Sequence, residues 1–183
     1  MVRLEHMTKD DLSKVLDWNK NTTPEFLLQW AGGSVFKYPL TEEQLDIYFA
    51  RGVNEQASDT FVYKIVATEN NQCIGMIELG KIDRKNKSAR VGRVLIGEQD
   101  FRGRGIGQQV LRTILGIGFE EFDLHRISLG VFDFNQSAII CYEKVGFVKE
   151  GLLRDSRKVG NSYWSLFEMS ILEEEWRLSY KRS

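Results

Sequence analysis

The sequence predicts an α/β protein built on a mixed sheet, in which antiparallel strands predominate and helices flank the sheet. Three consecutive strand candidates are separated only by short polar turns, which is typical of an antiparallel meander. A helix and a further strand follow them, and a right-handed crossover through that helix would place the new strand parallel to the one before it. With an N-terminal strand and a C-terminal hairpin, the sheet has about seven strands.

The N-terminal part is predicted to contain one strand and three short helices. Residues 2–7 alternate in polarity like a strand. Three capping patterns then mark the helix starts, because each supplies a preferred cap or first helical residue. These pairs are Thr8 with Asp11, Thr23 with Pro24, and Thr41 with Gln44.

The remaining chain alternates strands with helices. Glycines at positions 116 and 118 weaken the end of the first of these helices, which we expect to fray there. Asn135 is a good cap for the second helix, which Gly146 would end. The predicted strands cover residues 61–68, 73–82, 89–97, 126–132, 147–153 and 163–172, and the helices begin at residues 106 and 135.

Length and composition narrow the function classes. At 183 residues the chain suits one domain, residues 1–183, with a core that needs no disulfides. The 25 basic and 26 acidic residues leave a net charge of −1, so we expect neither nucleic acid nor a membrane as partner. Two cysteines, two histidines and no recognisable signal peptide predict a cytoplasmic protein without a bound metal.

The run from residue 102 to residue 107 reads Arg-Gly-Arg-Gly-Ile-Gly and joins a strand to a helix. Glycines at every second position allow backbone N–H groups to converge on an anion, and a helix start adds its positive dipole end. The run therefore predicts a phosphate cradle, although a tight turn with solvated arginines is the competing interpretation. Gln108 breaks the dinucleotide-binding glycine pattern, and no P-loop Lys-Ser/Thr pair follows.

Two blocks of sequence resemble the GNAT superfamily of acyl-CoA-dependent N-acetyltransferases. In the first, Arg102, Gly105 and Gly107 match the family pattern Arg/Gln-x-x-Gly-x-Gly/Ala. The second is similar to the family's Asn-x-x-Ala, Tyr and Gly-Phe pattern at the same spacing: Asn135, Ala138, Tyr142, Gly146 and Phe147. The longer N-terminal helical part looks like the subgroup of ribosomal-protein N-terminal and polyamine acetyltransferases.

The resemblance implies a GNAT-like twisted sheet whose central parallel strands splay apart around acetyl-CoA. It also implies which residues bind this cosubstrate. The backbone of one strand end would hold the thioester and pantetheine, the glycine loop would hold the diphosphate, and an asparagine would bond the cofactor arm. These residues are Leu95, Ile96 and Gly97, then Arg102, Gly103, Arg104, Gly105, Ile106, Gly107 and Gln108, and Asn135.

The resemblance makes Tyr142 the catalytic acid that protonates the leaving thiolate. Some N-terminal acetyltransferases of the family carry a glutamate base five residues before the asparagine, where this chain has Gly130. We therefore take Glu78 as the candidate base, with Glu150 as a second candidate. Cys141 lies beside the tyrosine, but adjacent helical residues point about 100° apart, so we do not expect it to be a nucleophile.

The predicted activity is direct transfer of an acetyl group from acetyl-CoA to a primary amine, either a peptide N-terminus or a small molecule. Large aromatic residues from the N-terminal helices and the last hairpin are expected to line the acceptor pocket: Phe26, Trp30, Tyr163 and Trp164. A catalytically silent acyl-CoA sensor or interaction module is the alternative. The resemblance further raises homodimer formation through the terminal hairpin as an expectation.

Overall fold

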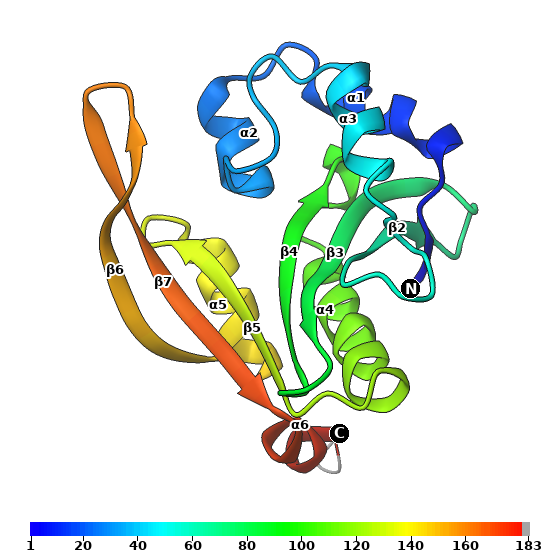
Figure 1. The fold of residues 1–183 in the computed structure, drawn as a ribbon, viewed down its shortest axis with the longest axis vertical. Helices are drawn as coiled ribbons and strands as arrows, with labels where there is room; N and C mark the ends of the chain where they lie inside the picture. Colours follow the sequence, from blue (N-terminus) through cyan, green and yellow to red (C-terminus); the bar gives the residue numbers. More distant parts are fainter. Residues whose placement is uncertain (181–183) are drawn as a thin grey trace.

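A computed structural model describes residues 1–180 and contains one seven-stranded mixed sheet with the strand order β1-β2-β3-β4-β5-β7-β6 (Figure 1). All neighbouring strands are antiparallel except β4 and β5, so the predicted fold class is confirmed. The strands are β1 (Val2–His6), β2 (Phe61–Ala67), β3 (Cys73–Asp83), β4 (Ser88–Ile96), β5 (Arg126–Phe132), β6 (Val148–Val159) and β7 (Ser162–Leu172).

Helices cover both faces of the sheet. The helices are α1 (Leu12–Asn19), α2 (Pro24–Ala31), α3 (Glu42–Phe49), α4 (Ile106–Gly116), α5 (Gln136–Val145) and α6 (Glu173–Tyr180). One core packs α4 and α5 against the sheet, and a second packs α1, α2 and α3 against side chains of β2, β3 and β4. Successive strand residues point to opposite faces, so the same strands supply both cores. Residues 1–180 contain no helix that is long and apolar enough to cross a membrane.

The predicted caps of the N-terminal helices are confirmed. The hydroxyl of Thr23 accepts a hydrogen bond from the Phe26 backbone N–H, and the hydroxyl of Thr41 accepts one from Gln44. Pro24 occupies the first turn of α2, where its missing N–H costs nothing. These caps fix the start of α2, which lies above the opening between β4 and β5 (Figure 1).

The parallel strands β4 and β5 pair over only three residues at one end and then diverge (Figure 1). The paired segment joins residues 88–90 to residues 126–128. Beyond it, β4 carries a β-bulge: Gly92 pairs with Glu78 and Leu95 pairs with Met76, so two residues of β4 oppose one of β3. The bulge includes Arg93, whose φ of 47° lies in the left-handed region. The splayed arrangement expected from the resemblance is thus present.

Three local predictions were incomplete or wrong. The helix after the glycine loop does not fray at Gly116 but continues as a π-helix over Ile117–Glu121. Gly118 allows this helical segment to pack closely against β5, because a Cβ on it would lie 2.5 Å from Ile127 Cδ1. The strand predicted over residues 147–153 extends to Val159, and the sequence analysis missed α6. Trp176 of α6 is buried and its ring lies 5.3 Å from that of Phe119.

Candidate active site

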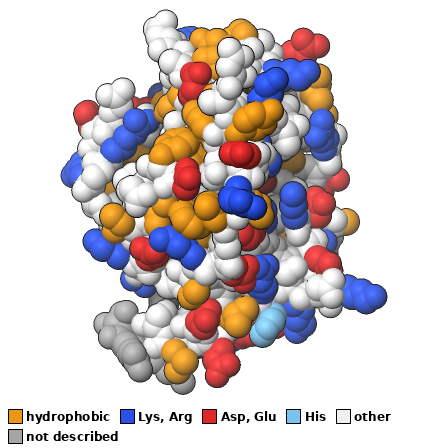
Figure 2. Space-filling view, turned by 90° about the vertical axis from the view of Figure 1, so that its left-hand side faces the viewer, with side chains coloured by type: hydrophobic (Ala, Val, Ile, Leu, Met, Phe, Trp, Pro, Cys, Tyr) orange, Lys and Arg blue, Asp and Glu red, His pale blue; other side chains and the backbone are white. Residues whose placement is uncertain are grey.

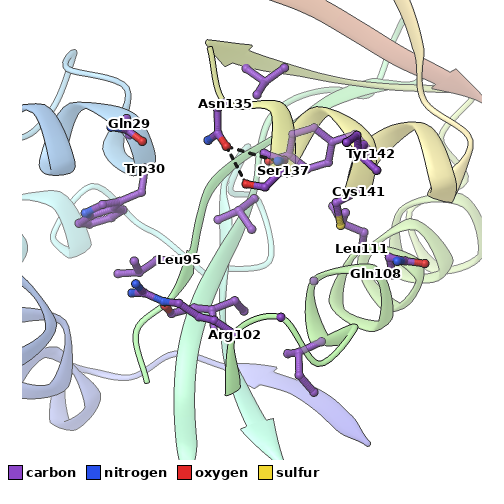
Figure 3. A pocket seen from close by; sticks show the side chains of 18 of the residues that line it. Gln29, Trp30, Leu95, Arg102, Gln108, Leu111, Asn135, Ser137, Cys141 and Tyr142 are labelled. Atoms are coloured by element: carbon purple, nitrogen blue, oxygen red, sulfur yellow. Dashed lines mark hydrogen bonds between the residues drawn. The ribbon is translucent and has the colours of Figure 1, made fainter. Parts of the chain in front are cut away.

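A cavity of about 550 Å³ lies between the diverging strands β4 and β5. Its wall combines α2, the end of β4, the glycine loop with the start of α4, and one face of α5 (Figure 3). Most predicted cofactor-binding residues line it, although they come from three separate segments. They are Leu95, Ile96, Arg102, Gly103, Gly105, Ile106, Gly107, Gln108 and Asn135.

The glycine loop has the backbone geometry of an anion-binding turn. Gly103 and Gly105 have φ values of 72° and 74°, a region in which a Cβ is strained. Gly105 is the N-cap of α4 and supplies no side chain to bond the first-turn N–H groups, which are left for a ligand at the positive end of the helix. Gly107 serves helix packing, because a Cβ there would lie 3.2 Å from Cys141 Sγ on α5.

Two predicted cofactor residues lie outside the cavity wall. Gly97 instead lies under the indole of Trp18, where a Cβ would be only 2.1 Å from Trp18 Cδ2. The guanidinium of Arg104 lies 5.5 Å from the centre of the Phe101 ring. Arg102 does line the cavity, and its Nε donates a 2.9 Å hydrogen bond to the Ile96 carbonyl, which ties the loop to the end of β4.

Helix α5 presents Asn135 and Tyr142 to the cavity, two turns apart as its spacing predicts. Asn135 Oδ1 accepts hydrogen bonds from the Ala138 backbone N–H at 3.3 Å and from Ser137 Oγ at 3.1 Å, so it caps the helix (Figure 3). Burial, and secondarily the neighbouring Cys141, raises the pKa of the Tyr142 phenol above its usual value. Tyr142 is therefore protonated at neutral pH.

A second, smaller cavity of about 190 Å³ adjoins the first, with which it shares wall residues from α2 and β5. The shared residues are Gln29, Trp30, Gly130 and Phe132. The rest of its wall comes from the end of α2 and the turn after it, from β3, from residues 90–93 of β4 and from the β6–β7 hairpin. The two cavities are therefore neighbours that meet at α2 and β5.

Glu78 lies in the second cavity and not in the first. It is 7 % exposed, accepts a hydrogen bond from the Tyr48 hydroxyl and forms an ion pair with Arg93. Among the described residues that line the two cavities, Glu78 is the only carboxylate. Glu150 lines neither cavity, because Ser170 and Arg126 bind its carboxylate at the start of β6.

The predicted aromatic residues divide between the cavity and the hairpin. Phe26 and Trp30 of α2 line the large cavity. Trp164 instead packs edge-on against Phe132 at 5.0 Å, and Tyr163 is more than half exposed. Neither of these two hairpin residues lines either cavity.

Three further residues of α5, for which the sequence predicted no binding role, belong to the cavity wall. Ser137, Cys141 and Lys144 also line the large cavity. Their spacing of four and three residues places them on one helix face beside the face that carries Asn135 and Tyr142, so the helical period could have identified them. Burial raises the pKa of the Cys141 thiol, so a nucleophilic thiolate at neutral pH is disfavoured.

A mixed sheet that splays around a cavity, with an uncapped helix N-terminus on one wall and a tyrosine on the other, is the arrangement expected of an acyl-CoA-dependent acyltransferase. The family model of the acetyltransferase (GNAT) domain matches residues 2–148, so the chain belongs to the GNAT acetyltransferases. It is accordingly an enzyme that transfers an acetyl group to an amine.

Curated relatives and solved structures agree with this assignment. The uncharacterized SPbeta prophage-derived N-acetyltransferase YokL of Bacillus subtilis is 28% identical over 73% of this chain and 78% of its own. The putative ribosomal N-acetyltransferase YdaF of Bacillus subtilis is 32% identical over 56% of this chain and 55% of its own. The structure of spermidine N-acetyltransferase from Vibrio cholerae in complex with CoA and spermine has a TM-score of 0.82, covers 96% of this chain and 98% of its own, and is 21% identical.

Proposed function

We propose that the protein transfers the acetyl group of acetyl-CoA directly to a primary amine, with acetyl-CoA bound in the 550 Å³ cavity. One observation carries the proposal: the uncapped N-terminus of α4 and the phenol of Tyr142 line the same cavity between splayed strands. The diphosphate would bind the N–H groups of the loop over residues 103–108, and Asn135 would bond the pantetheine arm. The acetyl end would then lie beside Leu95 and Ile96.

The proposed reaction needs only the amine, the thioester and the transfer of one proton. The neutral amine attacks the thioester carbonyl, the C–S bond breaks, and the amine loses one proton while the departing thiolate gains one. We assign stabilisation of the tetrahedral oxyanion to backbone N–H groups of β4 at the bulge, where strand pairing is interrupted. Tyr142 supplies a hydrogen bond or a proton to the thiolate.

The raised pKa of Tyr142 bears on how far this proton moves. An unperturbed phenol has a pKa of about 10 and a thiol one of about 8.5, so full transfer to the thiolate already costs roughly 2 kcal/mol. Burial increases that cost. We therefore infer that Tyr142 stabilises the thiolate mainly through a hydrogen bond, while positioning of the reactants supplies much of the acceleration.

We propose Glu78 as the carboxylate that accepts the amine's proton, directly or through water, because it is the only acid lining either cavity within the described residues. Tyr48 and Arg93 already bind this carboxylate. An α-amine has a pKa of about 7.8 and is over a tenth neutral at pH 7, whereas a lysine amine is neutral in well under about a thousandth of molecules. Because two side chains already bind the Glu78 carboxylate, we expect it to be a weak base, and such a site favours an acceptor amine of low pKa.

The acceptor would enter through the smaller cavity and place its amine near Trp30 and Gly130, where the two cavities meet. Both a peptide N-terminus and a small-molecule amine fit this proposal. The relatives include a putative ribosomal N-acetyltransferase and a spermidine N(1)-acetyltransferase.

The test is release of free CoA thiol from acetyl-CoA in the presence of peptides, polyamines or aminoglycosides, with Tyr142→Phe as comparison. We expect release with at least one acceptor and a markedly slower rate in the variant. Tight CoA binding without release by any acceptor would contradict the proposal and favour an acyl-CoA sensor.

We also propose that two copies associate through the terminal hairpin. β6 is an edge strand, and this part of the molecule carries four large apolar side chains that are each more than two-fifths exposed: Val148, Leu152, Leu153 and Tyr163. Figure 2 shows hydrophobic patches among charged side chains on the face that carries β6. Light scattering should find a dimer that Leu153→Glu dissociates and that Leu178→Glu, at an exposed leucine of α6, leaves intact. A monomeric parent protein would contradict this.

A further inference from the structure

The smaller cavity is lined by four basic residues and one acidic residue. The basic residues are Lys81, Arg90, Arg93 and Arg157, and the acidic one is Glu78. In a cavity that receives a polyamine, an excess of carboxylates is expected, because like charges repel and opposite charges attract. This cavity has the opposite balance.

Two of these cations are already neutralised. Arg93 pairs with Glu78, and Arg90 forms a two-pronged ion pair with Glu168 of β7, in which Nη2 lies 2.9 Å from Oε2. Such bidentate pairs are the most strongly oriented ones that arginine makes. These two arginines therefore add no net charge to the cavity.

The other two cations have no carboxylate partner within residues 1–180. Lys81 lies on β3 with a φ of 52°, and Arg157 lies on β6. Arg157 donates only to the carbonyl and the hydroxyl of its neighbour Ser156. Both are exposed side chains of the cavity wall, so the wall carries a net charge of about +2.

We propose that the acceptor is a small amine that also carries a carboxylate, and that Lys81 and Arg157 bind this carboxylate. The proposal rests on the acetyl transfer proposed above, in which the amine end lies where the two cavities meet. A cavity of about 190 Å³ is smaller than the roughly 300–1,000 Å³ typical of sites for drug-sized ligands, so it suits one short acidic segment. That segment is either a free amino acid or an acidic residue next to a peptide's N-terminus.

The test compares acceptors that differ in this one charge. The tripeptide amides serine-glutamate-alanine and serine-glutamine-alanine share the same amine, length and capped C-terminus. Free glutamate separates an amino acid from a peptide as the source of the carboxylate, and spermidine represents polycations. We expect kcat/KM for thiol release to be at least about 10-fold higher with the glutamate peptide than with the glutamine peptide, and lowest with spermidine.

Charge-removing variants connect the preference to the cavity. Lys81→Gln and Arg157→Gln should each reduce the preference for the glutamate peptide by about 3- to 10-fold, whereas the matched control Lys85→Gln should not change it. Lys85 is an exposed lysine between β3 and β4 that lines neither cavity. Equal use of both peptides, a preference for spermidine, or an unchanged preference in both cavity variants would overturn the proposal.

Calorimetry separates this proposal from the proposed reaction. The CoA-loaded protein is titrated with each peptide, so binding is measured without turnover. If no acceptor releases thiol, the proposed function fails. Tighter binding of the glutamate peptide, lost in Lys81→Gln, would then still support the carboxylate site, and equal binding would overturn it.

Discussion

The guanidinium of Arg90 occupies the space above Gly130. Arg90 Nη2 lies 2.5 Å from the position that a Cβ on residue 130 would take. Gly130 is also the cross-strand partner of Glu168, the residue whose carboxylate holds Arg90. Some members of the family carry a glutamate at the position of Gly130. In this chain, the absence of a side chain there makes room for an ion pair between β4 and β7.

Gly130→Ala should destabilise the protein, because the new methyl group displaces both Arg90 and Leu166, whose Cδ2 lies 2.8 Å from the Cβ position. Both atoms are the ends of flexible side chains, so we expect a cost near the lower limit of overpacking, about 1 kcal/mol. Urea denaturation measures the change. The control is Gly151→Ala on β6, where no atom lies within 4 Å of the added Cβ. An equal effect of both variants would show that the Arg90 contact is unimportant.

Much of the fold followed from the sequence because local signals and the sheet topology agree. The caps at Thr23 and Thr41 are local hydrogen bonds, and the parallel pairing of β4 and β5 follows from a crossover rule. The π-helix after Gly116 and the burial of α6 depend on packing against distant strands, for which no local pattern exists. Propensity alone therefore predicted fraying where tertiary contacts extend the helix.

The residues of the candidate site also differ in how well the sequence predicted their positions. The motifs and the helical spacing correctly predicted that Gly105 and Tyr142 would face the same cavity. The resemblance assigned Gly97 to the cofactor, whereas in the structure it follows the end of β4 and its missing side chain leaves room for Trp18, about eighty positions away in the sequence. The sequence also did not predict the charge balance of the smaller cavity, since its charged residues come from β3, β4 and β6, of which β6 lies far from the other two in the sequence.

Tyr142→Phe should lower kcat for thiol release by roughly 10- to 100-fold while leaving acetyl-CoA affinity nearly unchanged. The substitution removes only the hydroxyl, and loss of a catalytic proton donor typically costs about 10²- to 10⁴-fold; the lower figure applies because the phenol acts mainly as a hydrogen-bond donor. Steady-state kinetics and calorimetry with acetyl-CoA make the measurement. A matched Tyr163→Phe variant, at an exposed phenol of the hairpin, should retain full activity.

Gly105→Val should abolish measurable acetyl-CoA binding. A branched side chain at a φ of 74° is strained and covers the N–H groups at the start of α4. Gly160→Val is the control, because Gly160 has a similar φ of 58° and open space, but lies in the β6–β7 turn. Both variants carry backbone strain, so loss of binding in the first alone identifies the loop as the binding site. Unchanged affinity in Gly105→Val would contradict the phosphate cradle.

The Glu150 carboxylate should stabilise the folded protein at neutral pH and lose this effect in acid. The hydrogen bond from Ser170, and secondarily the Arg126 guanidinium, holds the pKa of Glu150 below its usual value of 4.5. A lowered folded-state pKa adds stability that is fully present above the unfolded-state pKa and lost as the pH falls through the folded-state value. Glu150→Gln should therefore cost about 0.5–1 kcal/mol at pH 7, and this difference should shrink below pH 4.5. Urea titrations at both pH values test it, and a pH-independent difference would refute the assignment.

Gly97→Ala should separate a structural role of this residue from a role in cofactor binding. The added methyl group would meet the rigid indole of Trp18, which its own hydrogen bond to Glu98 holds in place at 3.0 Å, so the free energy of unfolding should fall by about 1–3 kcal/mol. Acetyl-CoA affinity of the folded protein should not change. Adding Trp18→Ala removes the clash, so the double variant should be no less stable than Trp18→Ala alone. A double-mutant cycle measures this coupling between the two positions. Additive losses of stability would contradict the structural role of Gly97. A loss of acetyl-CoA affinity in a fully folded Gly97→Ala protein would show that Gly97 takes part in cofactor binding.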